Sequence, residues 1–160
     1  MEHLWSPWRY QYVTKAGSGE GCIFCLKPAA GEDEANHIVH RARFNYVILN
    51  LYPYTTGHLM VVPYAHLASP EDAPDETLIE MTMLARQAVR LLRAVYHASG
   101  FNLGMNLGEC AGAGVAGHFH MHVLPRWPGD SSFMTTVGET RVMPEDLSTT
   151  YRKLSEAFRQ

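Results

Sequence analysis

The stretch that decides the fold is Gly117-His118-Phe119-His120-Met121-His122-Val123-Leu124-Pro125-Arg126. Histidine alternates here with apolar residues, and successive side chains of a β-strand point to opposite faces. We therefore expect a strand over residues 119–124 that anchors its apolar side in the core. Its other side would hold His118, His120 and His122 in a row on a rigid support, which is what a chemical site requires.

The alternating histidines have two further interpretations. A His-x-His pair on a strand can chelate a metal ion, zinc above all, as in a mononuclear metallohydrolase. Such a site also needs a carboxylate, and the nearest are Glu109 and Asp130, both in expected loops. The strand could also be half-buried with a polar face that happens to be histidine.

Outward from this segment, the pattern predicts an antiparallel α+β fold with about five strands, one long helix and a C-terminal helix. Short β-branched or aromatic stretches mark strands at residues 38–39, 46–49, 59–62, 101–107 and 119–124. Apolar residues at helical spacing predict a helix from Asp75 with Gly100 as its stop, and a second after Pro144. Residues 16–21 and 27–34 have the composition of loops.

The composition favours one well-packed domain over residues 1–160: 46% of residues are hydrophobic and 18% are charged. The net charge of -3 argues against a nucleic-acid partner, which would need a basic face. We find no signal peptide and no apolar run that could span a membrane, so we expect no membrane partner. Three cysteines make no secreted disulfide framework, and a cytoplasmic location fits best.

Two of the cysteines form the pair Cys22-Ile23-Phe24-Cys25. The spacing alone is compatible with a redox pair, with two packed thiols or with half of a zinc site.

Several segments together resemble the histidine triad (HIT) superfamily. The segment 118–124 is similar to the family's His-φ-His-φ-His-φ-φ signature, with φ hydrophobic, and residues 49–63 are similar to its substrate-side hairpin. Residues 4–9 and 126–134 resemble the branch of diadenosine tetraphosphate phosphorylases and hydrolases. The resemblance covers nearly the whole chain.

The resemblance implies a nucleotidyl hydrolase or transferase that cleaves a dinucleoside polyphosphate at the α-phosphate. His120 would be the nucleophile that carries the nucleotide, and His122 and His58 would donate hydrogen bonds or protons to phosphoryl oxygens and the leaving group. A zinc-stabilised nucleotide-binding module without turnover and a nucleoside phosphoramidate hydrolase of the same superfamily are the alternatives. The resemblance also implies a homodimer and no organic cofactor.

The resemblance further implies substrate contacts and a structural zinc. Asn50 would contact the ribose, and Asn106 the phosphate side, next to a turn in which Gly112 and Gly114 let backbone amides approach an anion. The zinc ligands would be Cys22, Cys25, His66 and His118. The chain departs from many family members near Gly114-Val115, where it lacks their Gln and hydroxyl residue. Candidates to border the base are Trp5, Trp8 and Phe44, and Trp127 is ambiguous between substrate and packing.

Overall fold

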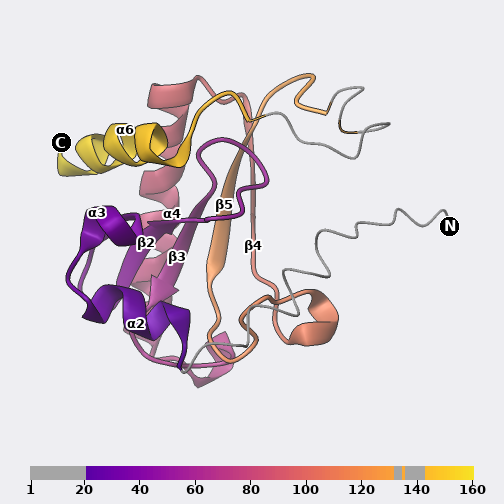
Figure 1. The fold of residues 1–160 in the computed structure, drawn as a ribbon. Coiled ribbons are helices and arrows are strands. Elements are labelled where there is room, and N and C mark those ends of the chain that lie inside the picture. Colours follow the sequence, from indigo (N-terminus) through magenta and orange to yellow (C-terminus); the bar gives the residue numbers. More distant parts are fainter. Residues whose placement is uncertain (1–20, 132–134, 136–142) are drawn as a thin grey trace, which may run out of the picture.

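The computed structural model describes residues 21–131, 135 and 143–160. Its centre is a five-stranded antiparallel sheet in the order β1-β2-β3-β5-β4 (Figure 1). The strands are β1 Ile38–Arg41, β2 Asn45–Leu49, β3 Leu59–Pro63, β4 Gly100–Gly104 and β5 Met121–Arg126. The expected number of strands and the α+β class are therefore confirmed.

Two long helices cover one face of the sheet, α4 Asp75–Tyr96 and α6 Leu147–Arg159 (Figure 1). Their apolar sides pack with Val47, Val61 and Val123 in the larger of two cores. Asp146 caps α6 by accepting a hydrogen bond from the Thr149 backbone N–H, which fixes the start of that helix. No helix of the described residues is long and apolar enough to cross a membrane.

The opposite face carries a smaller core and the short helix α2, Ile23–Ala29. Phe24 of this helix packs on Tyr46 and Met60 of the sheet, and the Tyr46 hydroxyl donates to the Phe24 carbonyl oxygen at 2.7 Å. Both faces of β2 and β3 are thus covered, and every residue of these two strands is buried.

The structure differs from the sequence-based expectations at several boundaries. Residues 27–34, expected as a loop, contain the end of α2 and the start of α3, Asp33–Asn36. The long helix ends at Tyr96 with His97 in the left-handed region, and Gly100 is the first residue of β4 instead of the helix stop. Strand β4 ends at Gly104 and does not reach residue 107.

Candidate functional site

The three alternating histidines lie on the face of the sheet that carries α2. His122 is in β5 opposite Met60, a residue of the smaller core. The expected strand over 119–124 begins only at Met121, because the Phe119 amide donates to the Leu67 carbonyl oxygen and not to the neighbouring strand. His118 and His120 therefore precede β5, and all three histidines are buried.

Four aromatic rings form a continuous row. The ring centroids of His58 and His122 are 5.0 Å apart, and those of His122 and His120 are 4.8 Å apart. Phe24 lies 4.8 Å from the ring centroid of His120. Nothing in the sequence pattern singled out Phe24; its place between the two cysteines is the one signal that could have drawn attention to it.

The hydrogen bonds of His58 determine which nitrogen of His122 carries a proton. The backbone N–H of Tyr54 donates to His58 Nδ1 at 3.2 Å, so this nitrogen must accept. In neutral His58 the proton is then on Nε2, which lies 2.8 Å from His122 Nδ1 and donates to it. His122 in turn carries its proton on Nε2, where it can act as a donor.

His120 has the opposite tautomer. Its Nδ1 lies 3.0 Å from the His118 carbonyl oxygen, and because a carbonyl only accepts, His120 Nδ1 carries the proton. The lone pair is therefore on Nε2. Burial lowers the pKa of His120, opposed in part by this hydrogen bond, and so favours the neutral, nucleophilic imidazole.

A glycine fixes the loop that supplies His58. Gly57 has a φ of +78°, and a Cβ on it would lie 2.9 Å from Leu92 Cδ2 of helix α4. Only glycine fits this close approach without strain. The loop therefore packs directly on the helix, and its position holds the His58 ring against His122.

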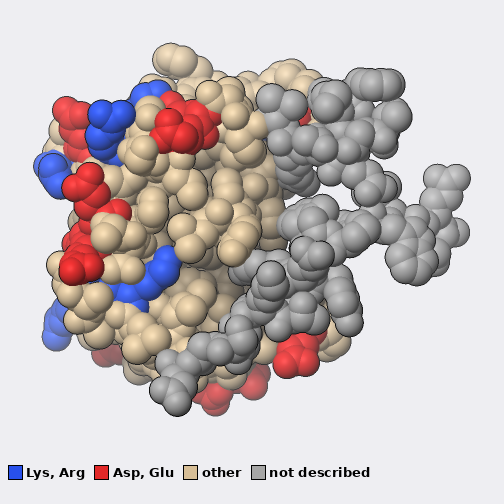
Figure 2. Space-filling view, viewed as in Figure 1, with Lys and Arg blue, Asp and Glu red and all other residues tan. Residues whose placement is uncertain are grey.

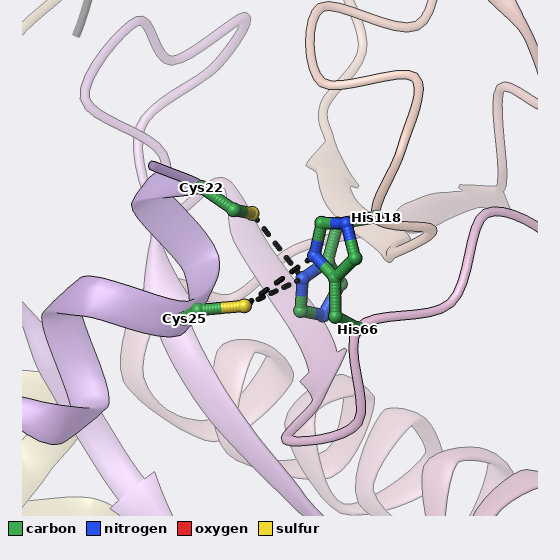
Figure 3. A group of neighbouring side chains, drawn as sticks. All are labelled: Cys22, Cys25, His66 and His118. Atoms are coloured by element: carbon green, nitrogen blue, oxygen red, sulfur yellow. Dashed lines mark hydrogen bonds between the residues drawn. The ribbon is translucent and has the colours of Figure 1, made fainter. Parts of the chain in front are cut away.

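The two cysteines meet two histidines on the same face of the sheet (Figure 3). Cys22 and Cys25 come from the start of α2, and their side chains point at His66 and His118. The four ligand atoms all lie within 4.8 Å of one another. The structure thus brings together the complete predicted set of metal ligands.

The distances within this cluster suit a tetrahedral ion. Cys22 Sγ and Cys25 Sγ lie 3.4 and 3.6 Å from His118 Nδ1, and Cys25 Sγ lies 3.4 Å from His66 Nδ1. Ligands on a tetrahedral zinc have an S···N separation of about 3.5 Å, given its usual bond lengths. His118 Nε2 lies 2.8 Å from the Pro63 carbonyl oxygen and must donate to it, which leaves Nδ1 to bind the metal. These side chains can hold a metal ion.

The histidines of the row do not belong to a group of side chains that could bind the metal of a metallohydrolase in the part of the chain that the structure describes. Within residues 21–131, 135 and 143–160, Cys22, Cys25, His66 and His118 are the one group of metal-ligating side chains. Asp130, a carboxylate that such a site could use, forms an ion pair of 2.6 Å with Arg126.

Of the residues predicted to contact substrate, Asn50 lies beside the histidines, and Asn106 lies in a loop after β4. Asn50 follows β2, is buried, and lies beside the histidines: its Nδ2 is 3.3 Å from His58 Nδ1. Asn106 lies in the loop after β4 and donates to the Gly112 carbonyl oxygen at 3.5 Å. Gly112 has a φ of +88°, which glycine adopts without strain. The contacts predicted for Asn106, Gly112 and Gly114 stay predictions.

The aromatic candidates lie in different parts of the chain. Phe44 lies in the turn between β1 and β2, where the Arg43 guanidinium lies 4.8 Å from its ring centroid. Trp127 follows β5, and its indole N–H donates to the Tyr96 carbonyl oxygen at 3.0 Å. Trp5 and Trp8 lie outside the described residues.

Charged side chains are sparse at the centre of this face. In Figure 2, viewed as in Figure 1, Lys, Arg, Asp and Glu are most frequent toward the left margin, with further acidic residues along the lower edge, and much of the described surface between is uncharged. An anion bound near the histidines would therefore be held by imidazoles and backbone amides rather than by a cluster of basic residues.

Comparison with known proteins agrees with this geometry. The HIT domain family model matches residues 31–129. The AP-4-A phosphorylase of Mycobacterium tuberculosis is 38% identical over 162 residues, which cover 97% of this chain and 83% of that protein.

Solved structures have the same fold. A Zn-bound histidine triad family protein from Mycobacterium smegmatis superposes with a TM-score of 0.70 at 32% identity, over 88% of this chain and 94% of that one. A hypothetical histidine triad nucleotide-binding protein from Sulfolobus tokodaii has a TM-score of 0.70 at 25% identity, over 86% and 92%.

Proposed function

The chain belongs to the HIT domain family, and from this premise we propose that it is an enzyme that cleaves a dinucleoside polyphosphate through a nucleotide carried on His120. Diadenosine tetraphosphate is the proposed substrate, in keeping with the AP-4-A phosphorylase to which the chain is 38% identical.

The observation that carries the proposal is the tautomer of His120. The His118 carbonyl oxygen holds the proton on Nδ1, so the lone pair of Nε2 can attack the α-phosphorus. A bond forms from Nε2 to phosphorus while the bond from phosphorus to the bridging oxygen breaks. AMP is then attached to His120, ATP leaves, and the positive charge of the ring is stabilised by the same carbonyl.

His122 and His58 support the same step. The Nε2 proton of His122 would be donated to phosphoryl oxygens as charge develops on them, and the 2.8 Å contact between His58 Nε2 and His122 Nδ1 would hold the ring for this role. Positioning and charge stabilisation are most of what phosphoryl transfer requires of a protein.

Inorganic phosphate is the proposed acceptor of the second step. A phosphate oxygen attacks the phosphorus of the AMP group, the bond to His120 Nε2 breaks, and ADP leaves. With water as the acceptor the product would be AMP. The relationship to a phosphorylase favours phosphate.

Zinc is the proposed occupant of the Cys22, Cys25, His66 and His118 cluster, supported by the ligand distances and by the Zn-bound relative. The ion would tie helix α2 to the segment before β5, which carries His120. Its role is structural, because His118 is then a ligand and does not act on substrate. The pair of metal-binding thiols fits a reducing cytoplasm.

A product assay tests the proposed function. Purified protein with diadenosine tetraphosphate and rising phosphate should release ADP and ATP in equal amounts. Protein denatured during turnover at alkaline pH, where a phosphorus–nitrogen bond survives, should carry up to one AMP group per chain. The His120→Gly variant should lose both turnover and the adduct. The matched His97→Gly variant should keep both, since His97 is exposed and its φ of +52° suits glycine. Release of AMP and ATP without ADP would show that water is the acceptor in place of phosphate, and full activity of His120→Gly would refute the covalent step.

A further inference from the structure

A large cavity lies beyond the histidines at the far end of β5. It has a volume of about 710 Å³, within the usual range for small-molecule sites. Leu124 and Arg126 line it, and side chains at alternate positions of a strand share a face, so both lie on the same face as His122. Asn102, which pairs with Leu124 across the sheet, lines the same cavity.

The cavity adjoins the proposed catalytic site through Tyr54. Tyr54 lines the cavity, and its ring centroid lies 4.8 Å from that of His58 and 6.0 Å from that of His122. The neighbouring residues Thr55 and Thr56 also line it. The loop that presents His58 thus forms part of the cavity wall, and Tyr54 lies between the cavity and His122.

The charges of the cavity wall are paired with one another. Arg126 forms a fork of two hydrogen bonds to Asp130, at 2.6 and 2.8 Å, and donates to Asn102 at 2.8 Å. Lys153 pairs with Glu145, which also accepts from the Tyr96 hydroxyl. Burial opposes ionisation of Glu145, but the hydrogen bonds from Lys153, Tyr96 and Thr150 outweigh it and lower its pKa. Two cations thus face two anions, and the wall offers little net attraction to phosphate.

Three aromatic residues are also part of the wall. Tyr54, Tyr96 and Trp127 contribute rings to the wall. Trp127 is held by its bond to the Tyr96 carbonyl oxygen, so its ring is oriented before any ligand binds. A wall of aromatic faces with polar groups around them and no net charge suits a nucleobase and its ribose, since stacking on aromatic side chains tolerates any base.

We propose that this cavity holds the second nucleoside of the substrate, the one at the far end of the polyphosphate from the nucleotide that His120 attacks. This proposal rests on the proposed function, because it assumes a substrate with two nucleosides. The polyphosphate lies over His120 and His122, and the leaving nucleotide places its base and ribose between Tyr54 and Trp127.

A binding measurement tests the proposal without requiring turnover. Calorimetry on His120→Gly protein compares diadenosine tetraphosphate with adenosine 5′-tetraphosphate, which has the same number of phosphates and lacks only the second nucleoside. Stacking of the second nucleoside predicts that the dinucleoside binds roughly tenfold to a hundredfold more tightly. Equal affinities would overturn the proposal even if the wild-type enzyme were fully active, and a clear preference would support it even if no turnover were found.

A variant whose side chain fills the cavity tests whether the tighter binding of the dinucleoside ligand arises there. Leu124→Trp places a large side chain in the cavity and should abolish the difference between the two ligands while leaving the affinity for adenosine 5′-tetraphosphate within a factor of about two. Ile79→Trp is the control, an exposed position on α4 on the opposite side of the sheet, and should keep the difference. A preference that survives in folded Leu124→Trp protein would show that the second nucleoside binds elsewhere. If Leu124→Trp does not fold, Trp127→Leu in the same comparison takes its place.

Discussion

In each functional histidine, one ring nitrogen forms a hydrogen bond with a fixed neighbour. This bond decides which nitrogen carries the proton and which role is left to the other nitrogen. A backbone carbonyl sets the tautomer of His118 and of His120. The tautomer of His122 is set by a backbone amide that acts through His58. The alternation in the sequence predicted which residues lie together. It could not predict the tautomers, because these depend on the carbonyls and amides of distant segments, such as Pro63 and Tyr54.

The role of Asn50 likewise depends on partners that the sequence does not reveal. The family resemblance predicts a ribose contact, but its amide lies behind His58, with Nδ2 3.3 Å from His58 Nδ1 and Oδ1 accepting from the Tyr52 backbone N–H at 3.0 Å. Both ends of the side chain thus have partners within the protein. Asn50 can therefore position His58, whether or not it also touches substrate.

A double-mutant cycle distinguishes the two roles of Asn50. If it acts through His58, Asn50→Ala should lower kcat by roughly tenfold, the loss of about one hydrogen bond, and should lower it no further in a His58→Ala background. A ribose contact instead predicts a raised KM that persists in that background. Steady-state kinetics of the two single variants and the double variant decide between them.

The metal cluster gives a second prediction at the level of single residues. Elemental analysis should find about one zinc per chain, and Cys22→Ser should lose the metal and unfold at a lower temperature. Cys110→Ser is the matched control, because Cys110 is exposed and is not part of the cluster, and it should keep both. Wild-type protein without metal, or a Cys22→Ser variant of unchanged Tm, would show that the cysteines only pack.

At the scale of elements, the long helices were predicted well from the sequence, and the short elements were predicted poorly. Helix α4 and helix α6 show several turns of apolar residues at helical spacing, which makes the pattern visible in the sequence. Helix α2 has only seven residues with Pro28 among them, and it is held by Phe24 packing on the sheet rather than by its own periodicity. The late start of β5 depends on Leu67, a residue far away in the sequence.

One carboxylate joins helix α4 to the turn between β1 and β2. Glu80 accepts hydrogen bonds from the backbone amides of Arg43, Phe44 and Asn45 and from the Asn45 side chain, at 2.8 to 3.0 Å. Burial alone would raise the pKa of Glu80, but these donors together lower it below its ordinary value. Its charged form is therefore favoured in the folded protein.

Removing this charge should destabilise the fold in a pH-dependent way. Glu80→Gln should lose about 1 kcal/mol of unfolding free energy at pH 7, a modest figure because Glu80 is only half-buried. Since the folded pKa is depressed, the stabilisation is present above the unfolded pKa of about 4.3 and is lost as the pH falls through the folded value. Urea unfolding should show the two proteins converging below about pH 4. Exposed Glu76→Gln should show little change at either pH; a constant difference from pH 7 to pH 3 would contradict the argument.

At the scale of the whole molecule, strand β4 is at the edge of the sheet formed by residues 21–131, where its one neighbouring strand is β5. Its residues Asn102, Leu103 and Gly104 are exposed, and Leu103 has 49% of its surface accessible. An exposed strand edge with an apolar side chain is a template for pairing with another strand. The family resemblance predicts a homodimer, and we propose that two copies pair through β4, which would extend the sheet across both subunits.

A lysine on this edge tests the proposed dimer. Leu103→Lys should convert a dimer, of twice the 18.0 kDa chain mass, to a monomer in light scattering, because two like charges would meet near the twofold axis. The side chain is half-exposed, so the monomer should keep its fold and its far-UV circular dichroism. Leu26→Lys makes the same chemical change at an exposed site on α2 and should leave the dimer intact. A wild-type protein that scatters as a monomer, or a Leu103→Lys protein that stays dimeric, would mean that β4 remains an unpaired edge protected by its short length alone.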